Sequence, residues 1–209
     1  LREEICEMNP KDTVSRIRKA WSLAGVGRFN ESRTLLLPIT QNDSETAGIR
    51  SRAAHALADI LWLSEKPAEA SALYEELLDE PLNAASHRSI WIKQKASAAA
   101  EEAWAQAIRD YLVNSRLKGK ERRAILRESV TAHPNHPLLL YLSGKLDLIR
   151  GNPAAAVATL ERAIPSITYP LLRGEALRSL GIALTHTDAP DKAIQIFRDM
   201  EAALPSDRE

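Results

Sequence analysis

YLSGKLDLIRGNPAAAVATLERAI, residues Tyr141–Ile164, is the stretch that decides the fold, because it predicts two helices joined by a very short break. Large apolar residues such as Leu146 and Ile149 recur at the spacing of one helical face. Gly151 then supplies a left-handed stop and Pro153 a first-turn residue, so a second helix begins after almost no loop. The alanines of that second helix allow two helix axes to approach closely. One hairpin cannot bury its own apolar side in water, so we expect copies of it to stack.

The composition of the 209 residues favours an all-α protein, because alanine and leucine dominate while aromatic residues make up only 5%. Lysine plus arginine and aspartate plus glutamate each total 28, so no net field recruits nucleic acid or a membrane surface. No apolar run reaches the ~18 residues that a membrane span needs, so we expect a soluble protein without membrane insertion.

Cys6 is the only cysteine, which excludes an internal disulfide. It leaves the compartment open between the cytoplasm, which is slightly favoured, and the periplasm. Because the sequence begins at Leu1 and not at methionine, we expect either a mature product or a domain of a longer protein.

Further copies of the hairpin are marked by proline. Pro67, Pro153 and Pro190 each follow an apolar helical stretch, and proline at a first helical position costs no hydrogen bond. We therefore expect three second helices to begin at these residues. Pro38 is expected to close an earlier pair. The predicted organisation is a lead-in (1–11), two hairpins (12–83), an irregular helix plus a degenerate repeat (84–135), two well-matched hairpins (136–205) and a tail (206–209).

The middle of the chain departs from the regular spacing. The stretch 84–100, AASHRSIWIKQKASAAA, has helical composition and no break. We interpret it as an unpaired helix, or as the start of one long helix that reaches Asn114. A degenerate hairpin is expected over 103–135, with Gly119 in the place of the proline.

The last copy resembles the tetratricopeptide-repeat (TPR) superfamily. It carries the large, Leu-Gly, large, Ala-x3-aromatic and Pro positions of that repeat pattern. These positions are Leu177, Leu180, Gly181, Leu184, Ala193, Phe197 and Pro205. The first copy has Ser32 where the family usually has alanine. The resemblance implies a divergent TPR-like repeat protein, a right-handed α-solenoid of about ten or eleven helices in antiparallel pairs.

In that family the first helix of each pair lines the concave surface, and the resemblance maps this lining onto ten residues. Tryptophan and tyrosine are enriched in binding hot spots, so an aromatic-lined groove would suit a peptide segment. Packing between copies is the alternative explanation for the aromatic residues. The family's clamp for a C-terminal carboxylate also needs asparagines, which are missing here. The predicted partner-binding residues are Trp21, His55, Asp59, Trp62, Trp104, Tyr111, Tyr141, Lys145, Arg178 and Ile182.

No catalytic, cofactor or metal site is predicted. His133 and His136 flank a proline in a turn, so they share no helix face and form no metal-ligand spacing. No G-x-S-x-G elbow, Walker loop or G-x-G-x-x-G is expected to follow a strand. A basic cluster, formed by Arg116, Lys118, Lys120, Arg122 and Arg123, either binds phosphate or solubilises a helix junction.

The sequence thus predicts a non-catalytic scaffold that binds a protein or peptide partner in its concave groove. The alternative is a sensor or spacer TPR domain within a larger enzyme, regulator or secretion and assembly protein. RNA binding is not expected, because basic residues do not recur once per repeat. The oligomeric state is left open.

Overall fold

The computed structural model describes residues 12–114 and 116–203, and these residues form eleven α-helices, one short 3-10 helix and no strand. The predicted all-α class and helix number are confirmed. The predicted lead-in (1–11), Cys6, Pro205 and the tail (206–209) lie outside the described residues. The chain divides into two compact units, Leu1–Arg122 and Arg123–Glu209, called unit 1 and unit 2 below.

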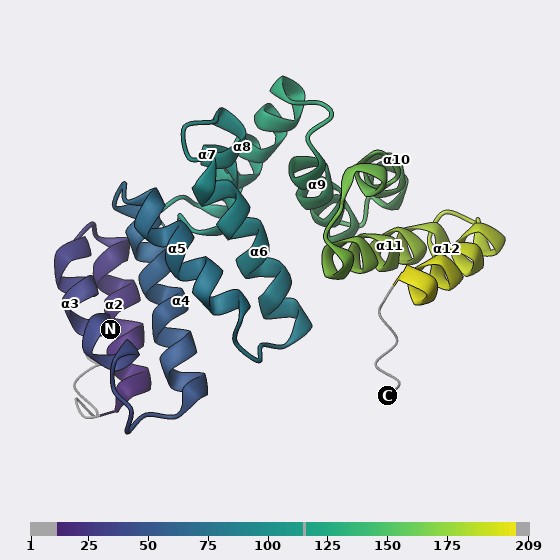
Figure 1. Ribbon diagram of the computed structural model, residues 1–209. Helices are drawn as coiled ribbons and strands as arrows, with labels where there is room; N and C mark the ends of the chain where they lie inside the picture. Colours follow the sequence, from purple (N-terminus) through teal and green to yellow (C-terminus); the bar gives the residue numbers. More distant parts are fainter. Residues whose placement is uncertain (1–11, 115, 204–209) are drawn as a thin grey trace. The chain divides into compact units, whose positions relative to one another are not determined.

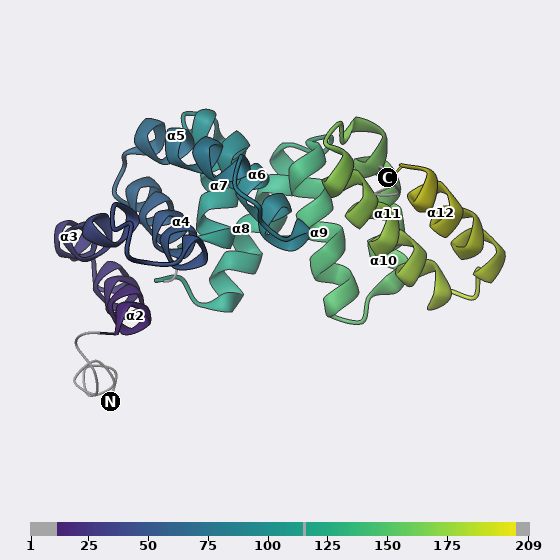
Figure 2. The ribbon, with the colours of Figure 1, turned by 60° about the horizontal axis from the view of Figure 1, so that its bottom comes forward.

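Unit 1 is a series of antiparallel helices in which each helix packs against the next one along the chain (Figures 1 and 2). Helix α2 also packs against α4. This is the stacking that a helical-repeat protein needs, because each amphipathic helix covers its neighbour's apolar side. The helices are α2 (Thr13–Gly25), α3 (Phe29–Thr40), α4 (Ala47–Leu63), α5 (Pro67–Leu78), α6 (Ala84–Ala98) and α7 (Ala103–Leu112).

In unit 2 the predicted hairpin is confirmed, since its helices run from Pro137 to Ile149 and from Pro153 to Ala163. Pro67, Pro153 and Pro190 each begin a helix, as the sequence predicts. The elements are α8 (Gly119–Ala132), whose first turn belongs to unit 1, α9 (Pro137–Ile149), α10 (Pro153–Ala163), η1 (Ile164–Ser166), α11 (Pro170–Thr185) and α12 (Pro190–Ala203).

Four turns between helices share one backbone feature, a residue with positive φ two positions before the second helix. Two of these residues are Gly27 (φ +82°) and Gly151 (φ +74°), where the missing Cβ makes a left-handed conformation inexpensive. The other two are Glu65 (φ +61°) and Asp188 (φ +54°). The same turn therefore recurs even where the sequence lacks glycine.

Small residues allow the paired helices to touch. A Cβ built on Gly144 would lie 2.7 Å from Leu160 Cγ, and one on Gly181 would lie 2.6 Å from the ring of Phe197. Both distances are shorter than real carbon contacts, so any larger residue at these two crossings would force Leu160 or Phe197 to shift. In the first pair the buried Ser32 takes the usual place of alanine, and its hydroxyl donates a 2.6 Å hydrogen bond to the Ala20 carbonyl.

Residues 84–114 differ from both interpretations of the sequence. A single helix reaching Asn114 is wrong, because α6 ends at Ala98 and α7 begins at Ala103. Nor is α6 unpaired, since it packs against α5 and α7. The break has no glycine or proline to announce it. It allows α7 to turn its buried side, which includes Ile108, onto the rest of unit 1.

Pro38 does not close the first pair. It lies inside α3, which continues to Thr40. Pro38 is exposed. It lacks an N–H and its ring crowds the carbonyl four residues earlier, so it removes one helical hydrogen bond from α3 without ending the helix.

Candidate functional site

Each unit contains a charged cluster that joins neighbouring helices of that unit and includes residues predicted to bind a partner. In unit 1 the cluster joins α4, α5 and α6, and in unit 2 it joins α9 and α11. The two clusters differ in the solvent exposure of their charged side chains. Only exposed charges can contact a partner, so this difference decides which cluster can bind one.

The unit 1 cluster consists of His55 and Asp59 of α4, Tyr74 of α5 and Lys93 of α6. Lys93 Nζ lies 2.8 Å from both carboxylate oxygens of Asp59 and 2.9 Å from His55 Nε2. The Tyr74 hydroxyl donates to Asp59 Oδ1. Lys93 and Asp59 are only 6% and 4% exposed. Their charges are therefore used within the protein, as a buried ion pair between helices.

The state of His55 follows from this geometry. An ammonium group only donates hydrogen bonds, so His55 Nε2 must accept one and the neutral ring carries its proton on Nδ1. Burial lowers the pKa of His55, Lys93 lowers it further and Asp59 offsets only part, so the pKa is about 4. Burial raises the pKa of Tyr74, and the charge of Asp59 raises it too. The cluster thus contains a neutral histidine and a neutral tyrosine at neutral pH.

The unit 2 cluster consists of Tyr141 and Lys145 of α9 with Glu175 and Arg178 of α11. Glu175 Oε1 accepts from Lys145 Nζ at 3.0 Å and from Arg178 Nη2 at 2.7 Å, and Oε2 accepts from Arg178 Nε at 2.8 Å. Lys145 also lies 3.4 Å from the Tyr141 hydroxyl. Burial alone would raise the pKa of Glu175, but the hydrogen bonds from Arg178 and Lys145 lower it to about 2.

The cations of the unit 2 cluster face solvent although their carboxylate does not. The Glu175 side chain is 5% exposed, whereas those of Lys145 and Arg178 are 38% and 49% exposed. Ile182, half-buried, lies one helical turn beyond Arg178 on α11. We call Lys145, Arg178 and Ile182 the α9–α11 surface. It presents two fixed cations beside an apolar side chain.

The predicted aromatic residues divide into two groups. Trp62 and Tyr141 are buried, with 2% and 3% exposure, and the Trp62 ring meets Tyr74 edge-on at a centroid distance of 6.3 Å. Core packing, the alternative explanation, is what the structure shows for these two. Trp21, Trp104 and Tyr111 are half-buried and keep part of their surface exposed. Partner contact by any of the predicted residues stays a prediction.

Two residues essential to these clusters were missed by the sequence reasoning. Glu175 lies three residues before Arg178 on one helix, and this spacing of opposite charges could have revealed it. Lys93 had no comparable local signal, because its carboxylate partner lies on a different helix.

A hollow of about 530 Å³ in unit 1 is lined by residues of α3, α4 and α5. Its apolar part is formed by leucines, and its rim includes Arg33 and Glu69, which pair at 3.7 Å. It is lined by Asn30, Arg33, Thr34, Leu37, Leu57, Leu61 and Glu69.

Two further searches concern metal and membrane. Within residues 12–114 and 116–203, no three histidine, cysteine, aspartate or glutamate side chains come together as a metal site would require. No helix in the same parts of the chain is both long and apolar enough to cross a membrane.

Comparison with known proteins gives distant likenesses. No protein-family model matches the sequence, and no curated protein does. Two solved structures, named "MamA MSR-1" and "MamA AMB-1", are 15% and 16% identical to this chain with TM-scores of 0.38 and 0.37. The alignments cover 91% and 93% of this chain, and 95% and 92% of the other chains. Likeness at this level carries no argument about function.

Proposed function

We propose that this protein is a non-catalytic, TPR-like scaffold that binds a segment of a partner protein on its α9–α11 surface. The observation that carries the proposal is the arrangement of Lys145 and Arg178, which are both held by the buried Glu175 and both exposed to solvent.

Anchoring these cations in advance favours binding. Long side chains normally lose rotamer freedom when they contact a partner, at a cost of about 0.5–1.5 kcal/mol each. Here the hydrogen bonds to Glu175 already restrict the rotamers of Lys145 and Arg178 in the free protein. Part of that entropy is therefore lost on folding and not on binding. Two cations against one carboxylate also leave one positive charge in excess. A carboxylate of the partner would accept hydrogen bonds from the outward N–H groups, while Ile182 would contact an apolar side chain.

Site-specific photo-crosslinking tests this proposal. A photoreactive amino acid placed at Thr185, exposed on α11 seven residues beyond Arg178, should capture a defined partner in extracts of the source cells. The same amino acid at Glu161, exposed on α10, is the matched control and should not capture it. Combining the Thr185 probe with Arg178→Ala should abolish capture while circular dichroism and thermal melts show an intact fold.

The result that would refute the proposal is equally concrete. If Thr185 and Glu161 probes capture the same proteins with equal yield, or if Arg178→Ala leaves the Thr185 product unchanged, the α9–α11 surface is not the binding surface.

A further inference from the structure

Two segments far apart in the sequence meet at one end of unit 1. The guanidinium of Arg116, in the connection between α7 and α8, lies over the ring of Phe29 at 4.7 Å from its centroid. A Cβ built on Gly27 would come within 3.0 Å of Arg116 Nη2. Stacking of this kind is favourable because the aromatic face is negative. The turn between α2 and α3 is therefore held against the connection before α8.

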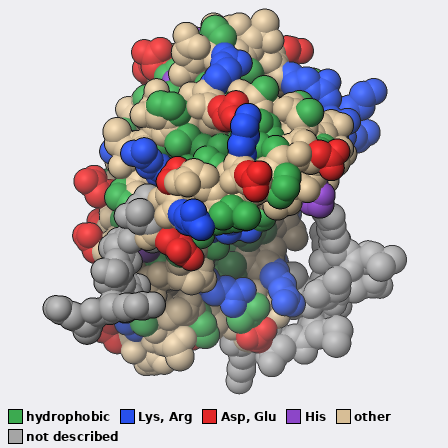
Figure 3. Space-filling model, turned by 90° about the vertical axis from the view of Figure 1, so that its right-hand side faces the viewer, with side chains coloured by type: hydrophobic (Ala, Val, Ile, Leu, Met, Phe, Trp, Pro, Cys, Tyr) green, Lys and Arg blue, Asp and Glu red, His purple; other side chains and the backbone are tan. Residues whose placement is uncertain are grey.

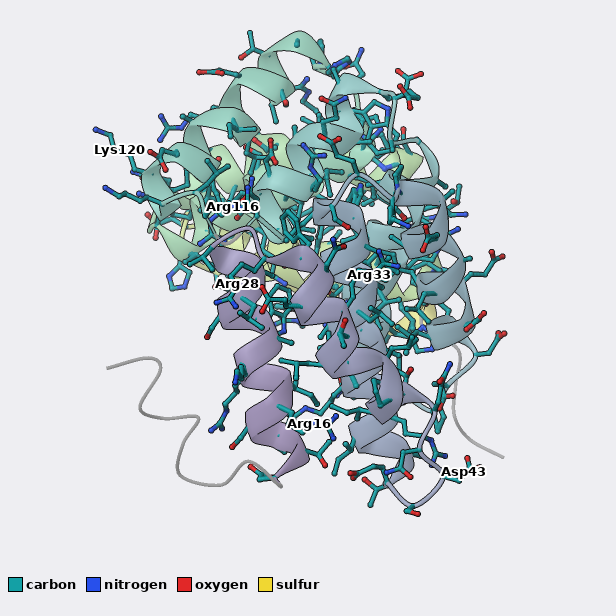
Figure 4. The ribbon with its side chains drawn as sticks, turned by 90° about the vertical axis from the view of Figure 1, so that its left-hand side faces the viewer. Arg16, Arg28, Arg33, Asp43, Arg116 and Lys120 are labelled. Atoms are coloured by element: carbon teal, nitrogen blue, oxygen red, sulfur yellow. The ribbon has the colours of Figure 1, made fainter. Side chains whose placement is uncertain are left out.

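This contact adds Arg28 to the basic residues of the connection. We call Arg28, Arg116, Lys118 and Lys120 the basic clasp. All four are exposed, and Figure 4 shows Arg28, Arg116 and Lys120 along the end of unit 1 that lies away from Asp43.

Few acidic groups balance the clasp. Arg28 pairs with Glu31. In the part of the chain that the structure describes, no carboxylate forms an ion pair with the side chain of Arg116, Lys118 or Lys120. The Glu121 carboxylate instead accepts the backbone N–H of Lys118 at 2.6 Å. Over much of the face shown in Figure 3 basic and acidic side chains are interspersed, but several basic side chains lie together at its upper right edge.

An apolar residue adjoins the clasp. Val26, next to Gly27 in the turn, is 73% exposed. A surface that combines cations with an exposed valine suits a protein segment better than a uniform polyanion. The formal net charge of zero also gives the whole chain no general attraction for nucleic acid.

We infer that the basic clasp binds an acidic segment of a partner protein, with Val26 contacting an apolar side chain of that segment. The clasp lies in unit 1 and shares no residue with the α9–α11 surface, so this inference does not depend on the proposed function. Opposite charges steer such an encounter and make it sensitive to salt.

Fluorescence anisotropy with labelled peptides tests the inference on the full chain. The probe is a peptide of alternating glutamate and leucine, and a peptide of glutamate alone is compared with it. In the double variant Lys118→Glu, Lys120→Glu, binding of the first peptide at low salt should weaken about tenfold or more. The matched control is Lys192→Glu, Arg198→Glu on α12, which makes the same charge change at exposed positions and should alter binding less than about twofold.

Two more measurements complete the design. Val26→Ser should weaken binding of the glutamate–leucine peptide but not of the glutamate peptide. Oligothymidylate and phosphatidylserine vesicles should bind more weakly than the glutamate–leucine peptide at equal salt. Circular dichroism checks that every variant is folded.

The inference is overturned if the wild-type protein does not bind the peptide at low salt, or if both charge-reversed variants lose binding equally. Tighter binding of oligothymidylate or of the vesicles would also overturn it, since the clasp would then recognise another class of partner. If the Val26→Ser variant binds the glutamate–leucine peptide as tightly as the wild type does, Val26 does not contact the bound segment and the inferred contact is overturned.

Discussion

Replacing Lys93 by methionine should strongly destabilise unit 1. Methionine keeps most of the length and apolar surface of the side chain but removes its charge. The Asp59 carboxylate would stay buried, with the Tyr74 hydroxyl as its remaining hydrogen-bond donor among the described residues. Removing one partner of a buried ion pair costs about 3–5 kcal/mol, because the other charge is left uncompensated.

A second substitution distinguishes the energetic effect of the lost ion pair from that of altered packing. In the double variant Asp59→Leu, Lys93→Met no charge is buried, but the Tyr74 hydroxyl loses its acceptor at a cost of about 1–3 kcal/mol. We therefore expect the double variant to be more stable than Lys93→Met alone by about 2 kcal/mol. Lys66→Met is the control, because Lys66 and Glu69 form a pair whose side chains are 39% and 52% exposed.

Urea denaturation followed by tryptophan fluorescence measures these effects selectively, since all four tryptophans lie in unit 1. The midpoint should fall sharply for Lys93→Met, partly recover in the double variant and stay unchanged for Lys66→Met. If Lys93→Met and Lys66→Met unfold at the same urea concentration, or if the double variant is the least stable, the buried ion pair does not hold α4 to α6.

Three other predictions follow from the packing and the pKa values. Gly181→Ala should destabilise unit 2 by about 1–3 kcal/mol, because the new methyl group would collide with Phe197. Gly48→Ala, where nothing lies within 4 Å of the new Cβ, should be neutral or slightly stabilising in the same thermal melts. The folded-state pKa of Glu175 is depressed to about 2, so its stabilisation of unit 2 is present above the unfolded pKa near 4.5 and should be lost as the pH falls through that window. Glu175→Gln should remove this loss when tyrosine fluorescence follows unfolding. The unfolded state binds a proton on His55 more readily than the folded state does, so the stability of unit 1 should fall between about pH 6.5 and pH 4. His55→Gln should flatten that part of a pH series recorded by tryptophan fluorescence.

The breaks between helices were predictable where a residue at the break has a local conformational preference. Gly151 and Pro153 end one helix and begin the next, and the structure places both at those positions. The break between Ala98 and Ala103 was not predictable, because alanine and glutamate favour helix and only packing of α7 within unit 1 decides otherwise. Local signals thus determined most of the helix boundaries, and long-range contacts determined the rest.

The candidate site shows the same division. Arg178 was predicted as a surface residue from its place on a first helix, and it is exposed. Trp62, assigned by the same reasoning, is buried against Tyr74 on another helix. Helical periodicity indicates which residues share a face, but the burial of a face depends on the neighbouring helix. The pairing of Asp59 with Lys93 is non-local in the same sense.

The two glycine contacts imply that substitutions in this protein should occur in coupled pairs. Gly144 faces Leu160 and Gly181 faces Phe197, and in both hairpins the large residue follows the small one by the same interval. Buried residues repeat this interval in unit 1. Residues at this interval are Ala20 and Leu36, Ala58 and Tyr74, and Ser97 and Val113, the residue that follows α7. An enlarged small member could be accommodated by shrinking its distant mate. In diverged relatives both residues of a pair should therefore vary together so that their summed side-chain volume stays constant. A comparison of sequences one position at a time would not detect this pattern.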